Sequence, residues 1–328
     1  TPDPIELFKI IKEMKNQGVD CLCFEASAHA LSLDKLAGIV SDIAILTNIT
    51  QDHLDFFKTM PAYAMAKAKL FTKQMSRVGI INTNTPLADA INYCSGIKTL
   101  TVGEKNNCDI KLIKSEATPS GQVMTVNFGN EERTYNLKLS GKFNAENALN
   151  VIAVGEILGL DRALVARSLE SAESVPGRFN TINKNGISFV IDYAHTPDGI
   201  KNALTACRDM ANERGGRVIA VFGCGGNRDA SKRQIMGKTA CDSADYVIIT
   251  SDNPRYEDPK IIISNIIWDI KQYTNYETVV DRSEAIRRAS LIAKPNDVVA
   301  ILGKGCENYL EINGTKVAYS DESEVRNL

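Results

Sequence analysis

Short apolar runs rich in β-branched residues alternate with helical stretches along most of this chain. Apolar positions at a period of 3.6 residues predict a helix over residues 4–18, with Gly18 in the place of a C-terminal capping glycine. The strand candidates in the first half are residues 19–24, 42–49, 77–83 and 97–103. Because helical crossovers join parallel strands, this alternation predicts an α/β fold with a mostly parallel sheet covered on both faces.

Residues 108–140 depart from this alternation. They contain three short strand candidates with turns at 119–121 and 129–130. We interpret the segment as a small antiparallel appendage on the first domain. Two helices are then predicted over residues 144–158 and 161–172.

Proline and glycine interrupt the pattern in the sequence VPGRFN at 175–180 and mark a domain boundary. We therefore expect one domain over residues 1–175 and a second over residues 176–328. The strand candidates of the second half are residues 187–193, 217–223, 245–252, 277–281 and 297–303. They predict a smaller, Rossmann-like, doubly wound domain, in which ligands bind beyond the carboxyl ends of the strands.

Composition narrows the class of protein. The 328 residues include 38 basic and 40 acidic side chains, and a formal net charge of −2 argues against a dedicated nucleic-acid-binding protein. No apolar run reaches the length of a membrane span, and no signal-peptide pattern is visible at the start of the sequence, so we expect none. The eight cysteines contain no CxxC pair. Scattered free thiols predict a cytoplasmic protein, and we expect Cys21 and Cys23 to be buried in a strand.

Polar clusters follow four strand candidates of the second half: DYAHTPDG, GCGGNRD, SDNPRYEDP and GKGCENY. The glycines at 223, 225 and 226, with Arg228 and the cations at 232 and 233, suit a phosphate or a carboxylate, although a tight turn before a solvated helix explains them equally well. Asp252, Asn253 and Arg255 could hold a zwitterion or form an Asx-type turn.

Two further clusters lie in the first half. Glu25 and His53 each follow a strand candidate, and a carboxylate with an imidazole could coordinate Mg²⁺ or position its water. All three histidines of the chain, at 29, 53 and 195, fall in such strand-end clusters. Lys67 lies in a predicted helix, where its pattern alone indicates a solvated face.

Taken together and in order, nine segments resemble the Mur ligases. These are FEASAHAL, TNITQDHLDFF, AKAKLF, GKFNAENALN, VPGRFN, DYAHTPDGIKNAL, FGCGGNRDASKRQIMG, TSDNPRYEDP and ILGKGCENY. The resemblance implies an ATP-dependent amide ligase of peptidoglycan synthesis, in which a glutamate carboxylate is phosphorylated by ATP and the amine of an incoming amino acid attacks the acyl phosphate. Its implied partners are UDP-MurNAc-L-Ala-D-Glu and meso-diaminopimelate, and the expected state is a monomer.

The resemblance also assigns residues. Glu25 and His53 would contact two Mg²⁺ ions, and Lys67 matches a lysine that family members have as a carbamate. The ATP site would include Asn147, Arg178, Asp192 and His195. Ser27 and Lys35 match positions near the nucleotide-sugar peptide. The amino-acid pocket would be formed by Arg228, Asp252, Asn253, Arg255, Gly303 and Glu307.

The stretch DNPR, at 252–255, is typical of members that add meso-diaminopimelate, because its arginine can bind the distal carboxylate that lysine lacks. The alternatives are a lysine-adding ligase and a degenerate paralogue that binds nucleotide or precursor. A folylpolyglutamate or cyanophycin synthetase is disfavoured by DNPR and GKGCE. An unrelated dinucleotide-binding domain is disfavoured by the lack of GxGxxG with a downstream acid.

Four features depart from the family pattern. EASAH replaces the usual EVSSH, Lys35 replaces an arginine and loses its bidentate fork, and Cys306 replaces the histidine of GKGHE. The sequence also contains no GxxxxGK[ST] loop, which family members have upstream of their TPDP segment. We therefore expect a P-loop-type central domain without its phosphate-binding portion, and a fragment that is inactive by itself.

Overall fold

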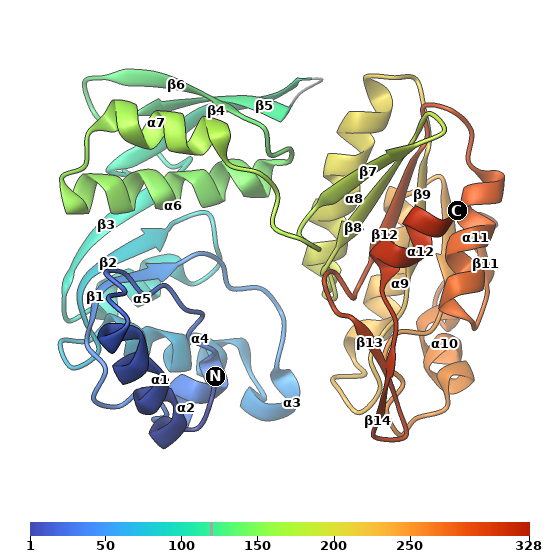
Figure 1. Ribbon diagram of the computed structural model, residues 1–328, viewed down its shortest axis with the longest axis horizontal. Helices are drawn as coiled ribbons and strands as arrows, with labels where there is room; N and C mark the ends of the chain where they lie inside the picture. The colour runs from blue at the N-terminus through green and yellow to red at the C-terminus, as the bar shows by residue number, and fades with distance from the viewer. Residues whose placement is uncertain (119–120) are drawn as a thin grey trace. The chain divides into compact units, whose positions relative to one another are not determined.

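The computed structural model describes residues 1–118 and 121–328, including every side chain in these ranges except that of Asp55. The predicted turn at 119–121 thus lies largely outside the described residues. The fold is α/β, as expected, and contains two six-stranded sheets and one two-stranded sheet (Figure 1). Contacts between residues divide the chain into two compact units.

Unit 1 comprises residues 1–113, 126–133 and 146–165, and unit 2 comprises residues 114–125, 134–145 and 166–328. The domain boundary after residue 175 stays a prediction.

The first sheet has the strand order β1-β2-β3-β4-β5-β6. Its strands are β1 (Ser41–Leu46), β2 (Ser76–Asn82), β3 (Lys98–Gly103), β4 (Ile110–Thr118), β5 (Gly121–Asn127) and β6 (Glu132–Leu137). Strands β1 to β4 pair in parallel. The short β5–β6 turn is closed by the Phe128 amide donating to the Glu131 carbonyl, a connection that joins antiparallel strands. The predicted parallel sheet with a three-stranded appendage is therefore confirmed.

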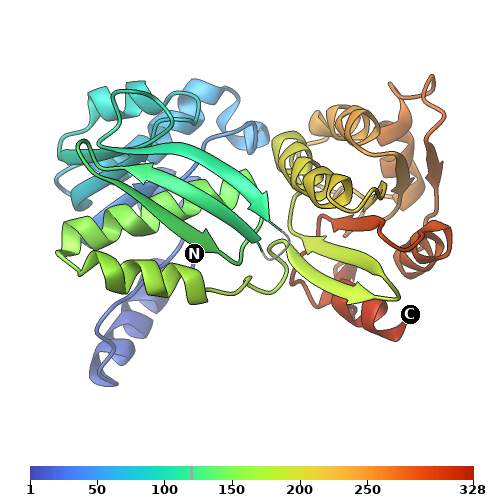
Figure 2. The same ribbon diagram turned by 90° about the horizontal axis from the view of Figure 1, so that it is seen from above.

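Helices in the first half follow the predicted pattern. They are α1 (Pro4–Asn16), α2 (Ala28–Ser32), α3 (Leu54–Phe57), α4 (Met60–Ala68), the 3₁₀ turn η1 (Lys69–Phe71), α5 (Ala88–Cys94), α6 (Lys142–Leu158) and α7 (Arg162–Ser171). Gly18 has a φ of +78°, as expected after a helix. Figure 2 shows α6 and α7 side by side. Gly155 of α6 faces Val165 of α7, and a Cβ added at Gly155 would lie 2.8 Å from Cγ2 of Val165.

The strand predicted at residues 19–24 is wrong. This segment has no regular secondary structure, and both Cys21 and Cys23 are exposed rather than buried. Alternating apolar residues fit a strand only when a neighbouring strand completes the hydrogen-bond ladder. In the described part of the chain, β1 ends the sheet and pairs with β2 alone, so this segment has no ladder to join.

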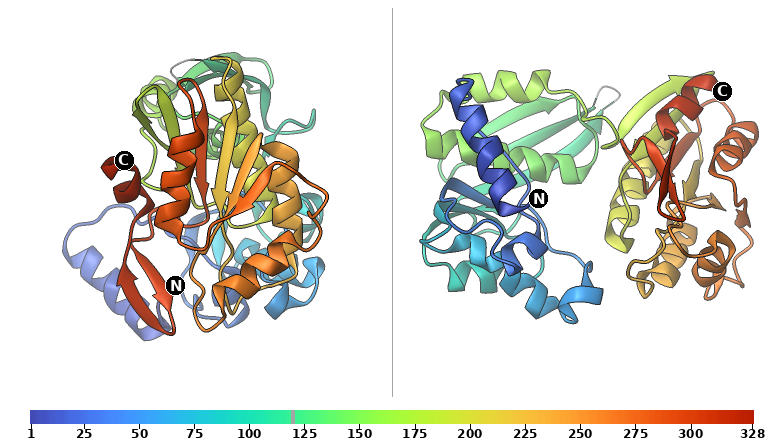
Figure 3. Two further views of the ribbon diagram at one scale, coloured as in Figure 1. Left: turned by 90° about the vertical axis from the view of Figure 1, so that its right-hand side faces the viewer. Right: turned by 60° about the horizontal axis from the view of Figure 1, so that its bottom comes forward.

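The second sheet has the order β11-β10-β9-β12-β8-β7. Its strands are β7 (Asn180–Lys184), β8 (Ile187–Asp192), β9 (Val218–Phe222), β10 (Tyr246–Ile249), β11 (Tyr276–Thr278) and β12 (Val298–Leu302). The five strands β8 to β12 were predicted and pair in parallel. Strand β7 was missed and pairs antiparallel to β8. The hairpin of β13 (Tyr309–Ile312) and β14 (Thr315–Ala318) was also missed and forms a separate ribbon (Figure 3).

Alternate residues of the second sheet enter two different cores. One face, which includes Val218 and Ala220, packs against α8 (Pro197–Asn212), α9 (Lys232–Ser243) and α10 (Pro259–Ile267). The other face, which includes Ile219 and Val221, packs against α11 (Arg282–Ile292) and α12 (Asp321–Asn327). Strands buried on both faces direct their polar residues to the loops at the carboxyl ends. Within the described residues, no helix is long and apolar enough to cross a membrane.

Candidate functional site

The first candidate group lies in unit 1 around Lys67, near the carboxyl end of α4. The amine lies 5.2 Å from the centroid of the Tyr63 ring. Burial lowers the pKa of Lys67, although the carboxylates of Glu25 and Asp52 act in the opposite direction. The same burial, followed by these two carboxylates, raises the pKa of Tyr63 to about 12. Lys67 is partly buried, whereas its pattern alone had indicated a solvated face.

His53 precedes α3 in a left-handed backbone conformation, with a φ of +57°. Its backbone amide donates to Asp52 Oδ1 at 2.9 Å, and its Nε2 lies 3.6 Å from Asp52 Oδ2. Its ring meets that of His29 edge-on with 4.8 Å between centroids, and Tyr63 lies on another side at 5.9 Å. This geometry gathers Asp52, His53, Tyr63 and Lys67 in one place.

Glu25 is exposed at the end of the irregular segment before α2. Among the described residues, no three His, Cys, Asp or Glu side chains form a ready-made metal-binding group. The Lys67 amine is a cation and not a metal ligand. The donors therefore fit Mg²⁺ only if Lys67 becomes a carbamate, which would add an oxygen ligand to those of Glu25 and His53.

The other predicted residues of unit 1 have local partners. Ser27 Oγ accepts a hydrogen bond from the Ala30 amide at 3.2 Å and caps α2. Lys35 Nζ pairs with Asp3 Oδ1 at 3.0 Å. Asn147 is exposed on α6 in unit 1, whereas the other predicted ATP-site residues lie in unit 2.

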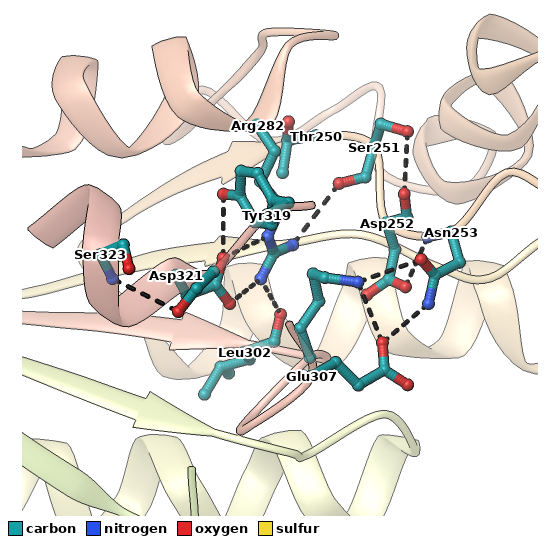
Figure 4. A network of polar contacts seen from close by, with 12 residues as sticks. Thr250, Ser251, Asp252, Asn253, Arg282, Leu302, Glu307, Tyr319, Asp321 and Ser323 are labelled. Atoms are coloured by element: carbon teal, nitrogen blue, oxygen red, sulfur yellow. Dashed lines mark hydrogen bonds and ion pairs between the residues drawn. The ribbon is translucent and has the colours of Figure 1, made fainter. Parts of the chain in front are cut away.

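The second candidate group lies in unit 2, in the loops that follow β10 and β12. Figure 4 shows Asp252, Asn253 and Glu307 drawn together there. Asn253 Nδ2 donates to Glu307 Oε2 at 2.8 Å, and the Asn253 amide donates to Asp252 Oδ1 at 2.6 Å. Gly303 has a φ of +112°, and a Cβ there would lie 2.7 Å from Asp252 Oδ2. Glycine at 303 is thus required by both conformation and space.

Arg255 has a left-handed backbone with a φ of +53°. Its Nε donates to Glu311 Oε2 at 3.2 Å, and its Nη1 donates to the Gly226 carbonyl at 2.8 Å. Its Nη2 makes no hydrogen bond to the described residues, so that it can donate to a ligand. Arg228 is exposed on the loop before α9, with its Cγ near Gly225.

The glycine-rich loop has a structural reason for its composition. Gly223 and Gly226 do not have positive φ values. Instead, a Cβ at Gly226 would lie 1.9 Å from the Pro254 carbonyl oxygen, so glycine permits the close approach of the DNPR loop. The guanidinium of Arg233 is buried and pairs with Glu257 at 2.9 Å. The charge of Arg233 had suggested a phosphate ligand, but the pair with Glu257 uses its guanidinium instead.

A buried ion pair lies behind the second group. Arg282 donates from Nε to Asp321 Oδ1 and from Nη2 to Asp321 Oδ2, both at 2.8 Å, and neither side chain is exposed. Nη2 also donates to the Leu302 carbonyl at 3.0 Å, at the end of β12. Burial alone would lower the pKa of Arg282, but Asp321 and then Asp252 raise it. Burial and Asp321 also raise the pKa of Tyr319.

Three predicted ATP-site residues meet around Tyr193, after β8. The Arg178 guanidinium lies 4.7 Å from the Tyr193 ring centroid, and the His195 ring lies 4.8 Å from it. Asp192 accepts hydrogen bonds from the amides of Phe179 and Ala194, both at 2.8 Å. Burial nevertheless raises the pKa of Asp192. The structure thus brings Arg178, Asp192 and His195 together.

Sequence reasoning missed several side chains of these groups: Tyr63, Tyr193, Lys304 and Glu311. Tyr193 and Lys304 lie within the polar clusters already singled out after strands, so their position was a usable signal. Glu311 offered none, because its ion pair with Arg255 joins residues far apart in sequence and depends on the unpredicted β13–β14 hairpin.

Comparison with known proteins identifies the family of the chain. The Mur ligase middle domain matches residues 1–155, and the Mur ligase glutamate ligase domain matches residues 177–305. The chain is similar to enzymes named UDP-N-acetylmuramoyl-L-alanyl-D-glutamate--2,6-diaminopimelate ligase. It is 41% identical to that of Clostridium botulinum, covering 99% of this chain and 66% of the relative. It is 38% identical to that of Aquifex aeolicus, covering 100% and 67%.

Solved structures give the same result. A structure of a ligase with the same name has a TM-score of 0.64 and 34% identity, covering 100% of this chain and 68% of that one. The MurF ligase of Thermotoga maritima in complex with ADP, at 19% identity, shares the fold with a TM-score of 0.65 over 84% of this chain and 61% of that one. The chain spans about two thirds of the length of these relatives. It belongs to the Mur ligase family.

Proposed function

We propose that this chain provides the amino-acid-binding and part of the catalytic machinery of an ATP-dependent ligase that adds meso-diaminopimelate to UDP-MurNAc-L-Ala-D-Glu. The observation that supports this proposal best is the group at the ends of β10 and β12. Asn253 donates hydrogen bonds to both Asp252 and Glu307, and Arg255 follows in the same loop. The relatives named for this reaction support the same substrate.

The pocket has both signs of charge, as a zwitterionic ligand requires. Arg255 Nη2, together with the exposed Arg228, can bind a carboxylate of the ligand. Asp252 and Glu307 can accept hydrogen bonds from an ammonium. Diaminopimelate has a distal carboxylate beside its distal ammonium, whereas lysine has the ammonium alone. The Nη2 donor of the partly buried Arg255 would have no acceptor when lysine is bound, and this would penalise lysine.

The proposed reaction has two steps. The glutamate carboxylate oxygen attacks the γ-phosphorus of ATP, and the bond to ADP breaks to give an acyl phosphate. The neutral amine of diaminopimelate then attacks the acyl carbon, and inorganic phosphate leaves as the amine loses a proton. Phosphoryl transfer depends chiefly on alignment and charge neutralisation. Arg178 and His195, which flank Tyr193, could supply part of the charge neutralisation around the phosphates of ATP.

Glu25, His53 and a carbamate on Lys67 would hold Mg²⁺ in unit 1. The metal, when bound, would neutralise negative charge on the phosphates. The lowered pKa of Lys67 supports this role, because the neutral amine is the form that reacts with CO₂. Asp52, which lies beside His53, can fix the orientation of its imidazole.

Arg255→Met tests the assignment of the pocket. The variant is expected to bind meso-diaminopimelate about 10- to 100-fold more weakly, the range for losing a hydrogen bond to a charged group, and to change L-lysine affinity less than threefold. Titration calorimetry on the 328-residue chain measures both affinities. Arg288→Met, which removes an exposed pair with Glu277, is the matched control. An equal loss for both amino acids would contradict the role of Arg255.

A further inference from the structure

Lys304 is a fully buried cation in the loop after β12. Its side chain has 0% exposure, and its Nζ lies 2.9 Å from Glu307 Oε2 and 3.0 Å from Asn253 Oδ1. Figure 4 labels Asn253 and Glu307, the two partners of Lys304, in one network of polar contacts with Asp252. Burying an ammonium is costly, and apolar packing would serve stability alone equally well. The position of Lys304 therefore suggests a role beyond stability.

Lys304 helps to fix the orientation of the side-chain amide of Asn253. Its Oδ1 accepts from Lys304 Nζ and from the Glu311 backbone amide at 2.9 Å. Since two donors hold Oδ1, the NH₂ group must point the other way, where it donates to Glu307 Oε2. The lysine thus fixes a side chain that has two nearly isosteric orientations.

The Glu307 carboxylate is held by the same cation. Its Oε2 accepts from both Lys304 and Asn253. Its Oε1 accepts no hydrogen bond from the described residues, and the side chain is 21% exposed. One oxygen is thus anchored and the other is available to a ligand.

We propose that Lys304 is the positioning residue of the amino-acid site, which holds Glu307 and Asn253 in the geometry that recognises the ammonium of the incoming amino acid. This inference rests on the proposed function, because it gives Glu307 and Asn253 their ligand. Lys304 acts through these two side chains and does not itself touch the substrate.

Lys304→Met tests this role, since methionine fills a similar volume without charge. We expect the KM for meso-diaminopimelate to rise at least tenfold, with kcat and the KM for ATP changed less than threefold. The assay uses the longest natural reading frame that contains this chain. Lys316→Met is the matched control, because Lys316 and Lys304 both lie over the Tyr309 ring, at 4.1 and 5.6 Å, but Lys316 is exposed. Its KM values should not change.

A second comparison applies even if Lys304→Met does not fold. The triple variant Lys304→Met/Asn253→Ala/Glu307→Gln leaves no unpaired charge at these positions, and it is compared with Asn253→Ala/Glu307→Gln by calorimetric binding of meso-diaminopimelate to the 328-residue chain. If Lys304 acts only through Glu307 and Asn253, the two dissociation constants should agree within about threefold. A further tenfold loss in the triple variant, or an unchanged KM in folded Lys304→Met, would overturn the inference. Failure of the unmodified protein to bind or use the amino acid would instead overturn the proposed function.

Discussion

Lys67→Met is expected to lower ligase turnover by about 10²- to 10³-fold, the range seen when one electrostatic contact to a transition state is removed. The variant cannot form the carbamate that would complete the group of Glu25 and His53. Methionine retains most of the packing against Tyr63. Turnover is measured in the longest natural reading frame that contains this chain, at saturating ATP and Mg²⁺.

Lys69→Met is the control for this variant. Lys69 follows α4 and pairs with the exposed Asp34 at 3.1 Å, so its loss should leave turnover within a factor of two. A carbamate can also be observed directly by NMR of the 328-residue chain supplied with isotopically labelled CO₂ and Mg²⁺. Because burial lowers the pKa of Lys67, its carbamate should persist at a lower pH than that of an ordinary lysine. Full turnover by Lys67→Met would contradict this role.

Asp321→Ala is expected to have the largest effect on stability, lowering the free energy of unfolding of unit 2 by about 3–5 kcal/mol, because it leaves the guanidinium of Arg282 buried without its counter-charge. The same change would release the contact of Arg282 with the end of β12. Urea unfolding, followed by the fluorescence of Trp268, measures the effect. Trp268 is the single tryptophan of the chain and lies in unit 2.

The same helix provides the control. Glu322 and Arg326 form an exposed pair at 2.7 Å on α12, and Glu322→Ala should cost at most about 1 kcal/mol. The double variant Arg282→Met/Asp321→Leu removes both buried charges and should be more stable than Asp321→Ala. Equal destabilisation by Asp321→Ala and Glu322→Ala would contradict a special contribution of the buried pair.

The sequence pattern predicted the position of strands that lie inside the second sheet, between two neighbouring strands. Strands β8, β9, β10 and β12 of the second sheet are apolar on both faces, and the predicted ranges contain them, whereas the range predicted at 277–281 only overlaps β11. The prediction at 19–24 was wrong because alternation specifies which side chains share a face and does not supply a pairing strand. β7 was missed because its polar sequence, NTINK, alternates at a sheet edge.

The candidate site was predictable in its groups but not in its internal contacts. The rule that ligands bind at the carboxyl ends of strands located Asp252 and Gly303 together. Which side chains neutralise one another depends on contacts between distant segments, such as Arg282 with Asp321 and Arg255 with Glu311. The local sequence pattern does not predict which distant residues form ion pairs. It therefore misread Lys67, whose burial is created by tertiary packing.

A competition assay tests the central claim most directly. The longest natural reading frame that contains this chain is supplied with ATP, Mg²⁺, UDP-MurNAc-L-Ala-D-Glu and equal amounts of meso-diaminopimelate and L-lysine, and the products are weighed by mass spectrometry. The geometry of Arg255, Asp252 and Glu307 predicts a product that contains diaminopimelate. A product that contains lysine, or no product at all, would contradict the account.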